Sequence, residues 1–177
     1  MSTLRIRLAG GDDAATVTDL FHATDAHYWG AAAPSYAATA AHVRDHVLAP
    51  GSGCEIALAE RDGVGLGYAT FAVLYPAPDL GGALFMKDLF VTGEARSSGI
   101  GEAMIRFLAA EALRRGCVRF DWSAETENQG ALRLYDRLGA QRVPNKVYYR
   151  LQADALHRLC AGAPGDGGPD GGIHAGG

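Results

Sequence analysis

The sequence lacks the marks of several large classes of protein. Its three cysteines, Cys54, Cys117 and Cys160, are far apart and form no C-x-x-C pair, so neither a disulfide framework nor a zinc knuckle is indicated. No N-terminal signal pattern is present, and no apolar run is long enough to span a bilayer. These absences predict reduced thiols and a cytoplasmic protein.

A long basic run is also missing, and the net charge is −4. This balance argues against nucleic acid as the main partner and is compatible with a cationic small substrate. His42 and His46 are four residues apart on an expected helix, a spacing that can bind a metal, but no third ligand or general-base Glu accompanies them. We interpret them as a solvated helix face and expect no metal.

What is present is a chain of 177 residues that is 48% hydrophobic and 20% charged, as is typical of a globular protein. Residues 1–160 are expected to form a single domain, large enough to bury a real core. From residue 161 the chain is Gly, Pro, Ala and Asp with almost nothing to bury. Residues 161–177 are therefore predicted to be a disordered tail.

Hydrophobic periodicity and turn residues predict a mixed succession of elements. Strands are expected at 4–9, 54–60, 64–75, 83–91, 117–123 and 143–151, and helices at 14–27, 35–48, 100–115, 128–138 and 153–159. The buried stripe of helix 100–115 is expected to comprise Ile100, Met104, Phe107, Leu108 and Ala112 or Leu113. Antiparallel hairpins come first and one β-α-β crossover follows, which predicts an α/β or α+β domain with a mixed sheet and helices on both faces.

The stretch 84–101 joins a β-prone strand to a glycine-rich turn and a helix N-terminus. Unpaired N–H groups and the positive end of the helix dipole at such a junction attract anions. Arg96 adds forked donors that suit phosphate, and Gly99 and Gly101 let phosphate approach the backbone. A P-loop is excluded because no Lys follows Gly101, and a dinucleotide fingerprint is disfavoured because position 104 is Met.

Two motifs carry a resemblance to a known family. Arg96-Ser-Ser-Gly99-Ile-Gly101 fits the Arg/Gln-x-x-Gly-x-Gly/Ala signature of the GCN5-related N-acetyltransferases (GNAT), and the run from Asn128 through Tyr135 to Gly139 resembles the second motif of that family. Lys87-Asp-Leu-Phe-Val91 precedes the first motif by the interval usual in the family. The chain looks most like the branch that holds diamine acetyltransferases and fungal histone and polyamine acetyltransferases.

The resemblance implies a GNAT-type fold, in which a mixed, mostly antiparallel and splayed sheet is flanked by helices on both faces. It implies direct acetyl transfer from acetyl-CoA to an amine, without a metal. The pyrophosphate would be held by backbone amides of Ser97, Ser98, Gly99, Ile100, Gly101 and Glu102 together with Arg96. Leu89, Phe90 and Val91 of the preceding strand would contact the cofactor, and a backbone N–H of Leu89 or Phe90 would stabilise the oxyanion. Tyr135 would be the general acid, and Asn128 would hold the pantetheine arm or the base of the splay.

Other side chains keep more than one interpretation. Asp88 is a candidate base or amine anchor, or a residue that caps the strand end. Glu125, Glu127 and Asp121 are competing bases that would act through water. Tyr28 and Trp29 could line an amine pocket by cation–π contact, or be a helix end tucked into the core.

The acceptor is expected to be a primary amine of a small molecule. The alternatives are a protein N-terminus or lysine, or a non-catalytic acyl-CoA-binding protein. Lys87 stands where the diamine branch usually has an acidic residue, and strand alternation would put Lys87 and Asp88 on opposite faces. By analogy with the branch, a homodimer that uses a strand at 147–151 is expected.

Overall fold

The computed structural model describes residues 3–162. The chain separates into two compact units, Met1–Ala124 and Glu125–Gly176, and each is considered by itself. Most of the predicted disordered tail, residues 163–177, lies outside the described residues.

The first unit is built on one five-stranded sheet with the order β1-β2-β3-β4-β5. The strands are β1 (Arg5–Leu8), β2 (Glu55–Arg61), β3 (Val64–Leu74), β4 (Gly82–Val91) and β5 (Cys117–Trp122). The first three pairings are antiparallel, and β4 and β5 are parallel. This confirms the predicted mixed, mostly antiparallel sheet with a single crossover.

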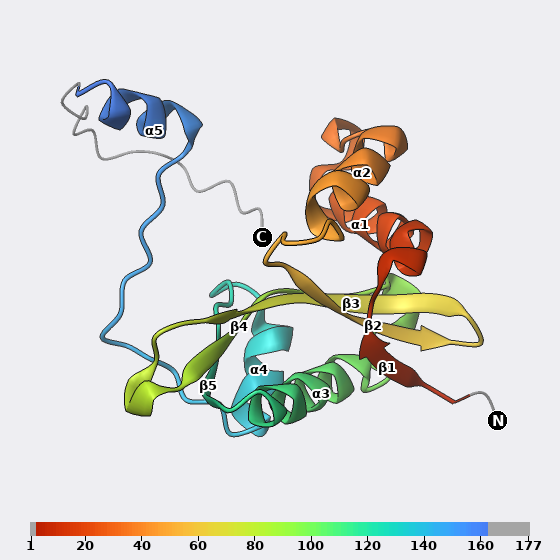
Figure 1. The fold of residues 1–177 in the computed structure, drawn as a ribbon. Coiled ribbons are helices and arrows are strands. Elements are labelled where there is room, and N and C mark those ends of the chain that lie inside the picture. The colour runs from red at the N-terminus through yellow and green to blue at the C-terminus, as the bar shows by residue number, and fades with distance from the viewer. Residues whose placement is uncertain (1–2, 163–177) are drawn as a thin grey trace. The chain divides into compact units, whose positions relative to one another are not determined.

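Helices cover both faces of this sheet, with α1 and α2 on one side and α3 on the other (Figure 1). They are α1 (Ala14–Trp29), α2 (Tyr36–His42), which continues into a π-helical segment (Val43–Val47), and α3 (Ile100–Arg114). Short 3₁₀ turns lie at Gly11–Asp13, Gly30–Ala32, Pro78–Leu80 and Gly93–Ala95. Ser35 caps α2 by accepting a hydrogen bond from the N–H of Ala38, and Gly30 ends α1 at a positive φ of 53°.

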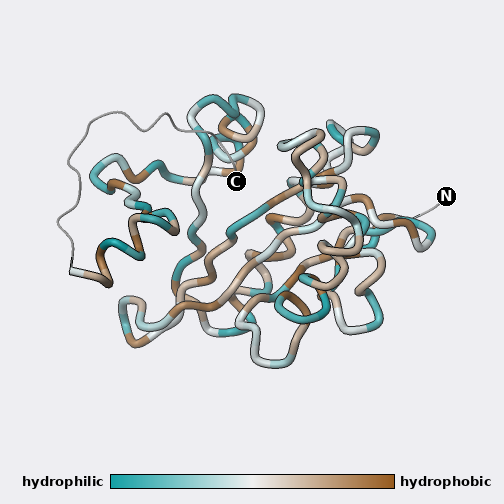
Figure 2. The backbone as a smooth tube through the Cα atoms, turned by 90° about the horizontal axis from the view of Figure 1, so that it is seen from above, coloured by the Kyte–Doolittle hydropathy of each residue, from teal (hydrophilic) through white to brown (hydrophobic). Residues whose placement is uncertain are grey.

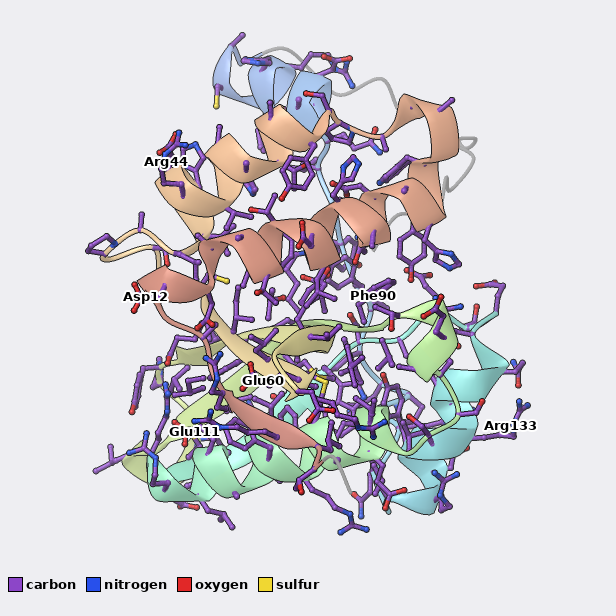
Figure 3. All side chains as sticks on the ribbon, turned by 90° about the vertical axis from the view of Figure 1, so that its right-hand side faces the viewer. Asp12, Arg44, Glu60, Phe90, Glu111 and Arg133 are labelled. Atoms are coloured by element: carbon purple, nitrogen blue, oxygen red, sulfur yellow. The ribbon has the colours of Figure 1, made fainter. Side chains whose placement is uncertain are left out.

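Each face of the sheet has its own apolar cluster. Under α3 lie Ala57, Ala59, Ala69, Phe71, Leu84, Met86, Ile100, Met104 and Leu108, and under α1 and α2 lie Val17, Leu20, Val43, Ile56, Leu58, Tyr68 and Phe90. Figure 3 shows Phe90 between α1 and the sheet, and Glu111 on the opposite side. Strand alternation supplies both clusters from β2, β3 and β4, which is why these three strands are apolar along most of their length. Ala112, not Leu113, belongs to the buried stripe of α3.

The second unit contains α4 (Gln129–Arg137) and α5 (Ala153–Cys160), both as predicted. The strand predicted at 143–151 is wrong, because these residues join no sheet in the described chain. Val147, Tyr148 and Tyr149 are exposed. β-Propensity measures how well a side chain fits a pleated and half-buried surface, so it does not make a strand where no partner strand is paired.

No helix in residues 3–162 is both long and apolar enough to cross a membrane. Figure 2 shows hydrophobic and hydrophilic residues interspersed along the tube.

An ion-pair network joins the end of α3 to the start of β2. The side chain of Glu111 is buried, and its carboxylate accepts hydrogen bonds from Arg114 at 2.6 Å and Arg115 at 2.7 Å. Arg115 also pairs with Glu55 and lies 5.3 Å from the centre of the Phe71 ring. Hydrogen bonds from Arg114 and Arg115 lower the pKa of Glu111 to about 2, and the network thereby fixes α3 against the sheet.

We predict that Glu111→Gln lowers the free energy of unfolding at neutral pH by about 1–3 kcal/mol, because two guanidinium groups lose a charged acceptor. The pKa of Glu111 is depressed in the fold, so its contribution is complete above the ordinary value of 4.5 and is lost as the pH falls toward 2. Thermal unfolding from pH 7 to pH 3 should show the two proteins converging. Asp45→Asn, which breaks an exposed pair with Arg44, is the control and should match the wild type. A constant difference across this pH range would contradict the prediction.

Candidate functional site

A β-bulge interrupts β4 in the middle of the sheet. In the pairing with β3, Thr70 faces Asp88 and the next residue, Phe71, faces Met86, so Lys87 is an extra residue. The bulge inverts the alternation of side chains. Leu84 and Met86 lie in the cluster under α3, whereas Phe90 lies in the cluster under α1 and α2. Asp88, two residues before Phe90, therefore shares the face of α1 instead of pointing into the apolar layer under α3.

Beyond the bulge, no strand in residues 3–162 pairs with the edge of β4 that faces away from β3, which we call its free edge. β5 pairs with β4 only as far as Met86, opposite Trp122. The N–H of Asp88 donates to Thr70 Oγ1 and the N–H of Thr92 donates to the carbonyl of Leu66, so both point toward β3. By alternation, the N–H of Leu89 points to the opposite edge, away from β3, whereas the N–H of Phe90 points toward β3.

The glycine turn that follows β4 ends in an uncapped helix. Ser97 and Gly99 have φ values of 63° and 82°, and Gly99 is the N-cap of α3 without a side-chain hydrogen bond. The first hydrogen bond of the helix runs from the N–H of Ala103 to the carbonyl of Gly99. The N–H groups of Ile100 and Gly101 precede that bond and form the positive end of a fifteen-residue helix. The junction therefore has the geometry of an anion site.

Arg96 connects this turn to β4 and to α1. Its Nε donates to the carbonyl of Val91 at 3.2 Å, and its guanidinium lies 6.0 Å from the centre of the Phe90 ring. One of its terminal nitrogens lies 3.4 Å from Nε2 of His27, in the last turn of α1. The arginine is exposed and shortly precedes the N-cap Gly99 in the chain, while its contacts hold the guanidinium against β4 and α1.

Asp88 is anchored on one side and ion-paired on the other. Thr70 Oγ1 donates to Asp88 Oδ2 at 2.5 Å, and Lys87 Nζ lies 3.1 Å from Oδ1. Lys87 and Asp88 are thus side by side, and the expectation that they occupy opposite faces is wrong. The bulge is the reason, because simple alternation fails where two residues of one strand oppose a single residue of its partner.

The surroundings of Asp88 are aromatic and acidic. Burial raises the pKa of Tyr68, and the negative charges of Asp88 and Asp25 raise it further. The Tyr68 hydroxyl donates to Thr24 Oγ1 at 3.1 Å. Tyr28 also acts on Tyr68, and both Tyr28 and Trp29 remain about half exposed, so these two residues do not form a helix end tucked into the core.

The second motif residues lie in the second unit. Asn128 Oδ1 accepts a hydrogen bond from the N–H of Ala131 at 3.0 Å and caps α4. Tyr135 lies on α4, and burial raises its pKa. Glu125 is exposed, and a hydrogen bond from Thr126 lowers the pKa of Glu127, which weakens it as a base. In the first unit, Asp121 on β5 pairs with Arg119 at 2.6 Å.

Three features of the site escaped prediction from sequence. The bulge at Lys87 has no signature in the sequence, because no glycine or proline marks it. Thr70 is one of many threonines in the chain, and only the strand register reveals its contact with Asp88. His27 is separated from Arg96 by 69 residues, and only the packing of α1 over β4 brings the two together.

Comparison with known proteins places these elements in a family. Residues 17–140 match the model of the Acetyltransferase (GNAT) family. The match covers more than half of the chain, and the chain therefore belongs to this family. The predicted resemblance to the GCN5-related acetyltransferases and the predicted fold class are confirmed.

Among curated proteins, the chain is 29% identical over 97 residues to thialysine N-ε-acetyltransferase of Mus musculus, which covers 53% of the chain and 56% of that protein. It is 28% identical over 99 residues to L-ornithine N5-acetyltransferase NATA1 of Arabidopsis thaliana, which covers 56% of the chain and 43% of that protein. The chain thus spans about half the length of the curated relatives it matches.

Among solved structures, an integron cassette protein from the mobile metagenome of V. cholerae has a TM-score of 0.85 and 32% identity, covering 89% of this chain and 97% of that one. The aminoglycoside N-acetyltransferase AAC(6')-Iy in complex with CoA has a TM-score of 0.67 and 18% identity, covering 86% and 97% of the two chains. The second comparison bears on the fold alone.

We predict that Thr70→Val destabilises the protein by about 1–3 kcal/mol, because it leaves the N–H and the carboxylate of Asp88 without their shared hydroxyl partner. At about 2–4 °C per kcal/mol, the melting temperature should fall by several degrees. Thr70→Ser keeps the hydroxyl and is the matched control. Equal melting temperatures for the Val and Ser variants would show that the contact contributes nothing.

Proposed function

We propose that this protein transfers an acetyl group from acetyl-CoA directly to a primary amine of a small molecule. One observation carries this proposal: three features follow one another along the chain from β4 into α3. They are the carboxylate of Asp88, which Thr70 anchors, the free edge of β4, and the uncapped start of α3 that follows Arg96. Membership of the acetyltransferase family supports it, as do the relatives named for acetylating thialysine and ornithine.

The pyrophosphate of acetyl-CoA binds at the turn before α3. The backbone N–H groups from Ser97 to Glu102 surround it, and Arg96 supplies the charge. In support, CoA is bound in the solved complex of the aminoglycoside acetyltransferase, which has this fold. A left-handed Gly99 lets the chain enter the helix at this point without a strained Cβ.

The thioester carbonyl lies along the free edge of β4. Attack by the amine places negative charge on its oxygen, and a fixed N–H aimed at that charge lowers the barrier. Of the two predicted donors, the N–H of Leu89 points to the free edge and that of Phe90 does not, so we propose Leu89.

Asp88 receives the acceptor amine. An alkyl ammonium has a pKa of about 10, so it must lose a proton before it can attack. The carboxylate of Asp88 pairs with the ammonium and accepts that proton directly or through water. Its hydrogen bond from Thr70 fixes its direction, which supports a role in positioning the amine.

Tyr135 protonates the departing CoA thiolate. Its position in the second motif supports this role, and its raised pKa means that the phenol keeps its proton at neutral pH. Asn128 caps α4 and so supports the helix that carries Tyr135. A contact between Asn128 and the pantetheine arm stays a prediction.

A homodimer and a cytoplasmic location also stay predictions.

We predict that Tyr135→Phe lowers kcat by about 10²–10⁴-fold, the usual contribution of a general acid, while affinity for CoA is retained. Thiol release across a panel of amines measures turnover, and calorimetric titration measures CoA binding. Tyr149→Phe, at an exposed position, is the matched control. A wild type that binds CoA and acetylates no amine would instead identify a non-catalytic acyl-CoA-binding protein.

We predict that Arg96→Ala raises KM for acetyl-CoA about 10–100-fold, the equivalent of one charged hydrogen bond worth about 1.5–3 kcal/mol, with a smaller change in kcat. Arg44→Ala is the control, because Arg44 lies outside the turn before α3 and forms an exposed pair with Asp45. Similar KM values for the two variants would remove Arg96 from the cofactor site.

A further inference from the structure

Lys87 is a charged residue beside Asp88, and the proposed acetyl transfer gives it no role. It is the extra residue of the bulge, and its side chain is 74% exposed whereas that of Asp88 is 26% exposed. Its Nζ lies 3.1 Å from Asp88 Oδ1 and 3.3 Å from Oδ2. The bulge therefore presents an ammonium on the solvent side of a more deeply placed carboxylate.

The two partners of this pair are held unequally. Asp88 is fixed to β3, because Thr70 both donates to its carboxylate and accepts from its N–H. Lys87 reaches Asp88 through a flexible four-carbon chain in solvent, where an ion pair contributes little to stability. An incoming ammonium can therefore replace Lys87 at Asp88, and the displaced lysine stays close by.

Charges of both signs surround this part of the site. The negative charges of Asp88 and Asp25 both raise the pKa of Tyr68, whereas Asp88 raises and Lys87 lowers the pKa of Cys54, which burial raises most. These carboxylates attract an ammonium and repel an anion. Lys87 offers the opposite charge at the outer end of the same site.

We propose that Lys87 determines acceptor specificity by binding an anionic group of the acceptor. The acceptor is then a primary amine that also bears a carboxylate, as an amino acid with a side-chain amine does. Its ammonium pairs with Asp88 and its carboxylate with Lys87. A polyamine would instead bring a second ammonium against Lys87. This inference rests on the proposed function, because it names the substrate class of the same site.

The test compares amines that differ by a single carboxylate, namely ornithine with putrescine and lysine with cadaverine. We expect the wild type to show a kcat/KM at least tenfold higher for the amino acid of each pair, measured by thiol release. Binding of the same four amines to the protein loaded with CoA, measured by calorimetry, should show the same preference without any turnover.

Substitutions at Lys87 should change the ratio between the two members of a pair. Lys87→Met is expected to lower kcat/KM for ornithine and to raise it for putrescine, and Lys87→Glu should reverse the preference. Lys87→Arg should retain it. The sequence has one other lysine, the exposed Lys146, and Lys146→Met is the matched control that should leave the ratio unchanged.

The outcomes separate this inference from the function on which it rests. A wild type that acetylates none of the four amines, nor any amine of a wider panel, yet binds ornithine at least tenfold tighter than putrescine would overturn the proposed function and support the role of Lys87. Equal binding of the two would overturn the role of Lys87, whatever the turnover. If Lys87→Met lowered binding and kcat/KM equally for ornithine and putrescine, Lys87 would have a structural role and no role in specificity.

Discussion

A β-bulge adds one residue to one strand of a pair, and in this sheet the added residue is Lys87. The rest of the site depends on that insertion. Before it, the even-numbered side chains of β4 lie under α3, and after it they lie under α1. If Lys87 instead took a regular place in the ladder, Asp88 would enter the layer formed by Met104 and Leu108, where a carboxylate would be buried at high cost. The bulge thus lets one strand serve an apolar core along its first half and a polar site along its second.

Near the bulge, the edge of β4 that faces away from β3 also becomes available for hydrogen bonding. β5 leaves the ladder at Met86, one residue before the bulge, so the backbone from Leu89 onward pairs with no further strand on that side in the described part of the chain. An unpaired strand edge invites hydrogen bonding by another chain or by a ligand. Here the edge is short and leads directly into the turn at Gly99 and the start of α3. A ligand with an extended amide-containing arm and an anionic head can satisfy both features at once, which is why strand edge and helix terminus are best considered as one site.

The fold was largely predictable because most of its helices and strands carry local signals in the sequence. Glycine and proline mark the ends of β2, β3 and α3. Apolar spacing gave the helices to within two residues of their ends, when the π-helical segment Val43–Val47 is counted with α2. The segment 143–151 was misjudged because its Val and Tyr residues favour strands only where a partner is paired with them. The uncapped helix start could be predicted because it lies in a continuous motif, Arg96 to Gly101. The site was not predictable where it depends on register, as with Thr70 opposite Asp88, or on packing, as with His27 beside Arg96.

Register also explains why the identity of residue 87 matters. In a regular strand, a side chain at this position would point away from Asp88, and exchanging an acid for a lysine would change only a remote surface. The bulge places Lys87 Nζ within hydrogen-bonding distance of the Asp88 carboxylate instead. The charge at this position therefore acts on the anchoring group itself. A sheet irregularity that first serves to orient a carboxylate thus also turns the neighbouring residue into a determinant of what that carboxylate can bind.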